Sequence, residues 1–154
     1  METKKSVLEV SAIENGTVID HIPSQNLFDV MNILQLDKMS NRITFGTNLD
    51  SVRIGKKAII KIADVHIGED QINKIIAFAP QARVSYIKDF KVERKVKVQV
   101  PDTIEGNIKC ANPMCITNLQ NVTTRFTVID KEALSIECHY CERTTLKSQF
   151  KLKL

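Results

Sequence analysis

The sequence predicts an α+β fold, with an N-terminal ferredoxin-like βαββαβ domain followed by a small all-β domain. Strand-like and helix-like segments follow one another in the order β-α-β-β-α-β over residues 7–87. Pro101-Asp102 then interrupts the chain, and four cysteines occupy the part that follows. We therefore expect a first domain over residues 1–100 and a second over residues 101–154.

The elements of the first domain follow from hydrophobic periodicity and turn signals. Residues 6–21 alternate in the manner of strands around Asn15-Gly16, which predicts a β-hairpin. Pro23-Ser24 begins a helix with Ser24 as its N-cap, and Gly68-Glu69-Asp70 opens a second helix that Pro80 ends. Further strands are expected at residues 42–46, 58–65 and 82–87.

Residues 91–100 alternate between charged side chains and valines at 96, 98 and 100. This pattern predicts an exposed, extended arm that follows the last strand and packs one face. Beyond Pro101, the strands expected to carry the cysteines lie at residues 107–109, 124–129 and 133–137.

The four cysteines form two close pairs, Cys110-x4-Cys115 and Cys138-x2-Cys141, separated by 22 residues. Each pair brings two sulfurs together in one tight turn, and folding joins the turns around one tetrahedral ion. Zn²⁺ suits four thiolates because it has no redox chemistry and no preference against a tetrahedron. The last third of the chain is therefore expected to be a zinc-ribbon-like domain with one structural Zn²⁺.

Other uses of these cysteines remain as alternatives. A disulfide framework requires a secretory route, but the N-terminal residues lack an apolar signal core. A redox Cys-x-x-Cys normally follows a βα unit, and a catalytic zinc keeps an open position that four thiolates do not leave. Structural zinc is the favoured interpretation.

Composition limits the classes of function. Lys and Arg outnumber Asp and Glu by 22 to 18, and the net charge of +4 permits an anionic ligand without requiring one. No apolar run reaches membrane-spanning length, so we expect a soluble, cytoplasmic protein with no membrane partner. The chain has no Gly-rich phosphate loop and no nucleophile elbow, which argues against an enzyme.

Five polar side chains in the first part of the chain suggest a binding site: Asp20, His21, Lys57, Lys61 and Lys95. A carboxylate can accept hydrogen bonds from ribose hydroxyls, and imidazolium and ammonium groups can neutralise a triphosphate. Surface lysines and a turn-capping Asp-His pair would explain the same residues without a ligand.

Nearly the whole chain resembles the regulatory chain of aspartate carbamoyltransferase, an enzyme of pyrimidine biosynthesis. The resemblance rests on the cysteine spacing and on Gly16-Thr17-Val18-Ile19-Asp20-His21-Ile22-Pro23, Arg42-Ile43-Thr44, Gly55-Lys56-Lys57, Ile60-Lys61-Ile62, Glu69-Asp70-Gln71 and Ala79-Pro80-Gln81-Ala82. It implies a non-catalytic allosteric subunit. Its first domain would bind nucleotides and pair regulatory chains, and its zinc domain would dock on the catalytic chain.

The resemblance further implies one shared site for CTP and ATP, with UTP assisting CTP in some members. By matching positions, Val10, Ala12 and Ile13 would face the base. Asp20 and Lys61 would bind the ribose.

The resemblance also implies which residues bind the phosphates and which line the pocket. His21 and Lys95 would bind the phosphates. Ile87 and Val92 would wall the pocket, and Lys57 would lend charge.

This chain departs from the family pattern at three places. Ser85 and Phe90 stand where relatives often place Asn and Tyr beside the base, and Val7 stands where they carry Lys. Lys4 and Lys5 lie just upstream as substitutes. The preference between CTP and ATP is therefore left open, as are the sign and strength of the response.

Two rival hypotheses remain. A nucleic-acid-binding zinc ribbon would use the basic residues around Lys91–Lys95 and the C-terminal lysines, but aromatics make up only 5% of the chain and acidic residues are interspersed. We therefore expect no nucleic-acid partner. A zinc-dependent enzyme requires an open coordination position.

Overall fold

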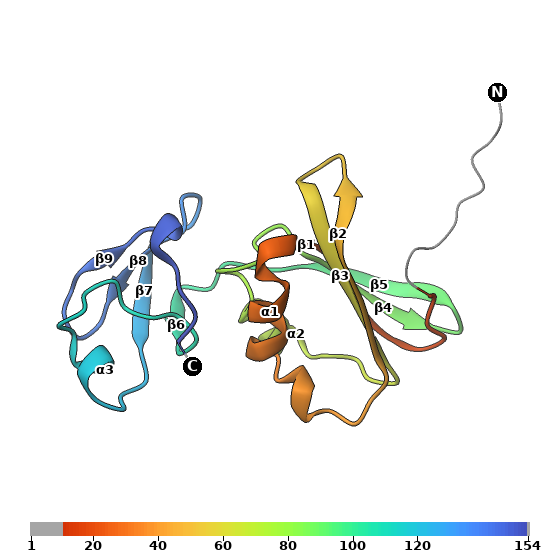
Figure 1. Cartoon of the computed structure of the whole chain (residues 1–154), viewed down its shortest axis with the longest axis horizontal. Helices are drawn as coiled ribbons and strands as arrows, with labels where there is room; N and C mark the ends of the chain where they lie inside the picture. Colours follow the sequence, from red (N-terminus) through yellow and green to blue (C-terminus); the bar gives the residue numbers. More distant parts are fainter. Residues whose placement is uncertain (1–10, 154) are drawn as a thin grey trace.

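The computed structural model describes residues 11–153 and contains two antiparallel sheets (Figure 1). The first sheet has the strand order β2-β3-β1-β4-β5. Its strands are β1 (Gly16–Pro23), β2 (Ile43–Ser51), β3 (Gly55–Ala63), β4 (Arg83–Lys88) and β5 (Lys91–Lys97). The predicted α+β fold with a ferredoxin-like first domain is confirmed, and the arm predicted after the last strand is a fifth strand at the edge of the sheet.

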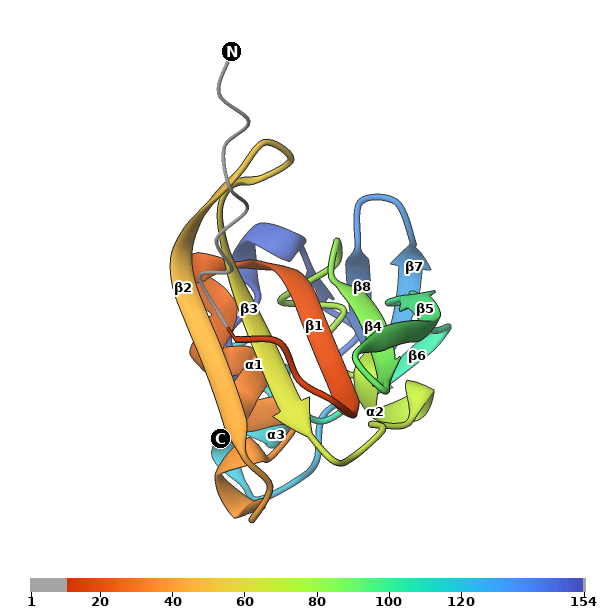
Figure 2. The same ribbon diagram turned by 90° about the vertical axis from the view of Figure 1, so that its right-hand side faces the viewer.

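Short helices cover one face of this sheet (Figure 2). They are η1 (Ser24–Asn26), α1 (Leu27–Ile33), η2 (Leu36–Lys38) and α2 (Glu69–Asn73). Alternate strand residues on this face, including Ile19, Ile60 and Val84, are fully buried against them. The hydrophobic core therefore lies between the helices and the sheet, and no helix of residues 11–153 covers the opposite face of the sheet, which we call the open face (Figure 2).

The helices differ from the predicted ones in two details. The Ser24 side chain does not cap α1; its Oγ accepts a hydrogen bond from Asn48 N–H at 3.1 Å, and a 3-10 turn precedes the α-helix. The second helix ends at Asn73 and continues as a series of turns, in which Phe78 N–H bonds to Ile75 O at 3.0 Å. This segment still buries its isoleucines, so tertiary packing outweighs regular helix geometry.

Strand β5 contains a bulge at Glu93. Tyr86 of β4 pairs with Arg94, but the next residue, Ile87, pairs with Val92, so Glu93 has no partner across the ladder. One extra residue reverses the faces of all side chains on one side of it. The strict alternation that the sequence predicted for this segment therefore does not extend past Arg94, and Val92 lies on the face opposite to Val96.

A second bulge lies in β1. Ile19 pairs with Ile60 of β3 and Ile22 pairs with Ala58, so Asp20 and His21 together oppose a single residue, Ile59. The bulge gives His21 a positive φ of 60°. The predicted hairpin over residues 6–21 is only partly testable, because residues 1–10 lie outside the described residues, and Ser11–Ile13 do not form a strand.

The second sheet has the order β6-β7-β8-β9. Its strands are β6 (Thr103–Glu105), β7 (Arg125–Asp130), β8 (Ser135–Cys138) and β9 (Thr144–Thr145). The same part of the chain contains the short helices α3 (Ile116–Leu119) and η3 (Lys147–Gln149). Phe126 and Ile136 fill its interior. The strand predicted at 107–109 was wrong: Ile108 makes only an isolated bridge to Leu152.

The helices of residues 11–153 are all too short or too polar to cross a bilayer.

Candidate functional site

The four cysteines converge at one end of the second sheet. The Sγ atoms of Cys110 and Cys141 are 3.6 Å apart, those of Cys115 and Cys138 are 3.8 Å apart, and all four lie within 4.8 Å of one another. A regular tetrahedron of thiolates around Zn²⁺, with Zn–S bonds of about 2.3 Å, has sulfur–sulfur edges of about 3.8 Å. The four residues therefore fit a tetrahedral metal ion.

The turns around the sulfurs are built to hold them. Glu142, with a φ of 62°, closes the second turn, and its N–H bonds to Cys138 O at 2.9 Å. Thr117, at the start of α3, donates from Oγ1 to Cys115 Sγ at 3.2 Å. Such bonds orient the side chains that bind a metal ion directly.

Burial raises the pKa of the Cys110 thiol to about 12, so this thiol must lose a proton to bind a metal. Burial also tends to raise the pKa of Cys141. Hydrogen bonds from the Arg143 backbone, the Asn112 side chain and neighbouring thiols outweigh that effect and bring it to about 7. Cys141 therefore loses its proton more readily than Cys110 does.

The second candidate site is the open face of the first sheet. Val18 of β1 pairs with Lys61 of β3 on one side and with Ser85 of β4 on the other, and Ser85 pairs with Lys95 of β5. Directly paired residues point to the same face of a sheet. Lys61, Val18, Ser85 and Lys95 therefore form one row across four strands, which we call the polar row.

The bulge at Glu93 is what places Lys95 in the polar row. In a regular strand, Val92 and Lys95 would lie on opposite faces, because they are three positions apart and faces alternate with every residue. With the bulge, Val92 pairs with Ile87 and Lys95 pairs with Ser85, both on the open face. The structure thus brings together two residues that simple alternation would separate.

Asp20, Lys57 and His21 lie next to the polar row. Lys57 Nζ is 2.9 Å from Asp20 Oδ1, and the His21 backbone N–H donates to the same carboxyl at 2.7 Å. His21 Nδ1 is buried and has no hydrogen-bond partner among the described residues, since Asp20 Oδ2 lies 3.8 Å away. Burial lowers the pKa of His21, and nearby Lys57 adds to the effect although Asp20 opposes it.

Lys61 is almost completely buried, with 8% of its surface exposed. Its Nζ donates to Ser11 O at 3.0 Å, so the segment before β1 lies over this end of the polar row. Burial lowers the pKa of Lys61, and Asp20 partly opposes that shift.

The apolar residues predicted around the ligand divide into two groups. Ile13 and Ile87 are buried at the Gly16 end of the open face, whereas Ala12 is exposed. Val92 and Phe90 are exposed, and Phe90 lies in the β4–β5 turn with 66% of its surface accessible. Val10 lies outside the described residues.

Two residues on this face were missed by the sequence reasoning. Thr44 of β2 pairs with Lys61 and so extends the polar row, and Arg83 of β4 pairs with Asp20. Strand register alone identifies them, and register is not visible in sequence alternation.

Two family models match the chain. The allosteric domain of the aspartate carbamoyltransferase regulatory chain matches residues 8–99, and the metal binding domain of the same chain matches residues 102–151. These matches define the class of protein as a regulatory chain with an allosteric and a metal-binding domain.

Relatives cover nearly the same length. The aspartate carbamoyltransferase regulatory chain of Bacteroides fragilis is 49% identical over 143 residues, which is 93% of this chain and 94% of the relative. Those of Parabacteroides distasonis, covering 97% of both chains, and Pyrococcus abyssi, covering 89% and 91%, are also 49% identical. The chain belongs to the family of aspartate carbamoyltransferase regulatory chains, and its role is regulatory rather than catalytic.

Proposed function

We propose that the open face of the first sheet binds CTP and ATP, with UTP as a further effector, and that residues 1–100 act as the allosteric domain. The observation that carries this proposal is the polar row, which aligns Lys61 and Lys95 on one face beside Asp20 and His21. The two lysines stand three strands apart, about 14 Å. An extended nucleoside triphosphate can therefore contact both.

Each predicted residue takes a role on this face. Asp20 and Lys61 bind the ribose, and His21 and Lys95 bind the phosphates. Lys57 neutralises Asp20 in the free chain through their 2.9 Å ion pair and can turn to the phosphates when the ribose hydroxyls engage the carboxylate.

The apolar walls and the base contact complete the proposed site. Ile87 and Val92 wall the pocket, and Ala12 and Ile13 face the base. Ser85 and Phe90 set the base preference.

Calorimetric titration of CTP, ATP and UTP into the chain tests the site. We expect saturable binding to the wild type, and weaker binding to Lys95→Ala with the zinc domain intact. Unchanged CTP and ATP affinity in Lys95→Ala would remove Lys95 from the site. Binding to DNA or RNA with a steep salt dependence, in place of nucleotide binding, would favour the nucleic-acid hypothesis.

We further propose that the metal is one structural Zn²⁺ per chain and that residues 101–154 dock on the catalytic chain of aspartate carbamoyltransferase. Apolar side chains next to the metal site support docking, because Met114, Ile116 and Leu119 are all exposed there. Co-purification with a catalytic chain, followed by effector titration of the aspartate saturation curve, tests both statements. Assembly that survives complete loss of metal would contradict the docking role.

The remaining partner is a second copy of this chain, paired through the first domain. Strand β2 is an edge strand, and Phe45 on it contacts Phe28 of α1 with both rings exposed. The other edge, β5, carries charged residues at most positions, which discourage strand pairing. We therefore place the self-association at the β2 edge.

Native mass spectrometry of Phe45→Glu tests this pairing, with Leu146→Glu as a control that alters an exposed apolar residue in the second domain. We expect Phe45→Glu to shift the chain from dimer to monomer and the control to leave the dimer intact. A dimer that withstands Phe45→Glu would move the interface elsewhere.

A further inference from the structure

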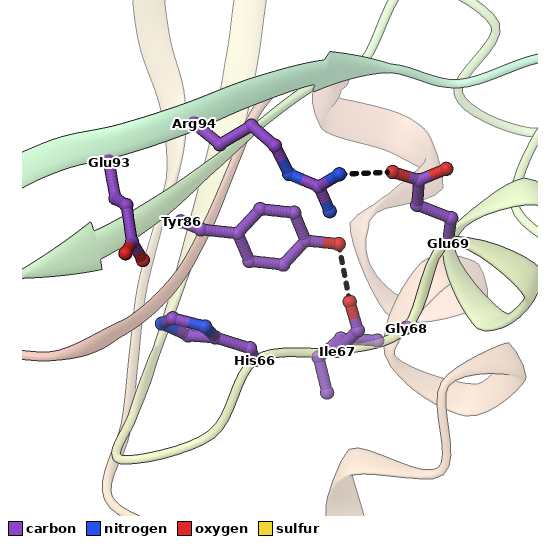
Figure 3. A pocket seen from close by; sticks show the side chains of 7 residues that line it. All are labelled: His66, Ile67, Gly68, Glu69, Tyr86, Glu93 and Arg94. Atoms are coloured by element: carbon purple, nitrogen blue, oxygen red, sulfur yellow. Dashed lines mark hydrogen bonds and ion pairs between the residues drawn. The ribbon is translucent and has the colours of Figure 1, made fainter.

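The helix-side face of β5 carries a cluster that lies outside the proposed nucleotide site. Because of the bulge at Glu93, Arg94 points away from the open face while its neighbour Lys95 points towards it. The Arg94 guanidinium lies 5.0 Å from the centre of the Tyr86 ring, and its Nη1 is 3.0 Å from Glu69 Oε1 (Figure 3). Arg94 thus joins β5 to the start of α2.

Tyr86 anchors the other side of the same contact. Its hydroxyl donates to Ile67 O, and the His66 ring packs against it with ring centres 5.2 Å apart (Figure 3). Ile67 directly precedes Gly68 and Glu69, where α2 begins. A displacement of Arg94 would therefore reach α2 both through the ion pair and through the Tyr86 ring.

The far end of α2 is attached to the segment that follows β5. The Gln99 backbone N–H donates to Asn73 Oδ1 at 2.9 Å, two residues before Pro101 and the second domain. Strand β5, which carries Lys95, therefore contacts Glu69, the first residue of α2. Asn73, the last residue of α2, in turn contacts the segment between the two domains.

The space around Arg94 allows this tie to change. A cavity of about 510 Å³ lies beside it, lined by the cluster residues together with Glu93. Both partners of the Arg94–Glu69 ion pair are about half exposed. The pair can therefore break or reform without repacking the core, as a switching contact requires.

We propose that Arg94 is a positioning residue that couples a nucleotide on the open face to α2 and, through Asn73 and Gln99, to the orientation of the second domain. This inference rests on the proposed nucleotide site. Lys95 senses the phosphates, and its backbone neighbour Arg94 transfers the displacement of β5 to Glu69. Arg94 itself does not contact the nucleotide.

The test uses the complete complex with the catalytic chain, carrying Arg94→Gln, Glu69→Gln or both, and Arg94→Lys as a conservative variant. Lys91→Gln is the control, because Lys91 is exposed on the same strand nearer the turn. We expect CTP affinity, measured calorimetrically, to stay within about twofold of wild type. The CTP-induced change in half-saturating aspartate should fall by about two- to fivefold, the range of an exposed ion pair.

Two further results are expected. The double variant should reduce the CTP-induced change in half-saturating aspartate no further than either single variant does. Arg94→Lys should recover part of this response. Hydrogen exchange should show CTP-dependent protection of the α2 amides in the wild type and its loss in Arg94→Gln.

Four outcomes would overturn the inference. If Arg94→Gln keeps the full response, or α2 shows no CTP-dependent protection in a wild type that binds CTP, the coupling route is wrong while the nucleotide site stands. If Arg94→Gln loses CTP affinity and response by the same factor, Arg94 belongs to the binding site. If the wild type binds no nucleotide, the proposed function fails first and this inference fails with it.

Discussion

Replacing Lys61 by Met separates a binding lysine from a structural one, because the two roles predict opposite changes in stability. Methionine keeps the length of the buried stem and removes the charge. Burial lowers the pKa of Lys61 from the ordinary lysine value of 10.5, so at lower pH the ammonium form is less favourable in the folded chain than in the unfolded chain. At neutral pH the charge therefore destabilises the free protein.

The magnitude follows from two opposing terms. Burial of a polar group costs about 1–3 kcal/mol, and the hydrogen bond to Ser11 O together with the attraction of Asp20 returns about 1 kcal/mol. Lys61→Met is thus expected to stabilise the free chain by about 1 kcal/mol, which raises Tm by about 2–4 °C for a chain of this size. A charge-assisted hydrogen bond to the ligand is worth about 1.5–3 kcal/mol, so CTP should bind about 10- to 150-fold more weakly.

Thermal unfolding followed by far-UV circular dichroism measures the first effect, and calorimetric titration with CTP measures the second. Lys91→Met serves as the control, since Lys91 is exposed in β5 and pairs with Lys88, away from the open face. A variant that is less stable than wild type would show that the Lys61 side chain stabilises the fold. A variant that is more stable but binds CTP normally would remove Lys61 from the site.

Further predictions concern the metal, His21 and Gly16, the first residue of β1. Cys115→Ser should lower bound zinc well below one ion per chain in elemental analysis. In chelator competition, the zinc affinity of the wild type should decrease as the pH is lowered, because zinc binding displaces thiol protons. CTP affinity should rise as pH falls from about 8 to about 6, because burial lowers the pKa of His21 below 6.5 and phosphates favour the imidazolium form; His21→Gln should abolish this dependence. By the same shift, the free chain should lose stability below about pH 6.5, a loss that His21→Gln removes in urea titrations. Gly16→Ala should destabilise the chain by about 2–4 kcal/mol in urea unfolding, because a Cβ there would lie 2.0 Å from Ile62 O with a φ of 142°.

The metal site was predictable from sequence because its information is local. The spacing of Cys138 and Cys141 fits a single tight turn, and two such turns need only one contact between them to make a tetrahedron. Predicting that the Sγ atoms of Cys115 and Cys138 meet, 3.8 Å apart in the structure, required no knowledge of strand register.

The open face was only partly predictable, because its residues meet through register. Alternation places Val96 in the core correctly, but it would also place Val92 on that face, and the bulge at Glu93 reverses the outcome. A bulge is one unpaired residue stabilised by the surrounding ladder, and the charged sequence of β5 contains no local signal for it. The family resemblance nevertheless grouped Val92 with Lys95, which simple periodicity could not do.

The two sheets share no strand in residues 11–153, and each completes its own ladder of hydrogen bonds on either side of the Pro101 junction. Chimaeras that join the front half of one relative to the rear half of another at this proline should therefore fold without new strand pairings. On the proposed function, effector preference would be inherited with the front half and recognition of the catalytic chain with the rear half, so that evolution can exchange one without rebuilding the other.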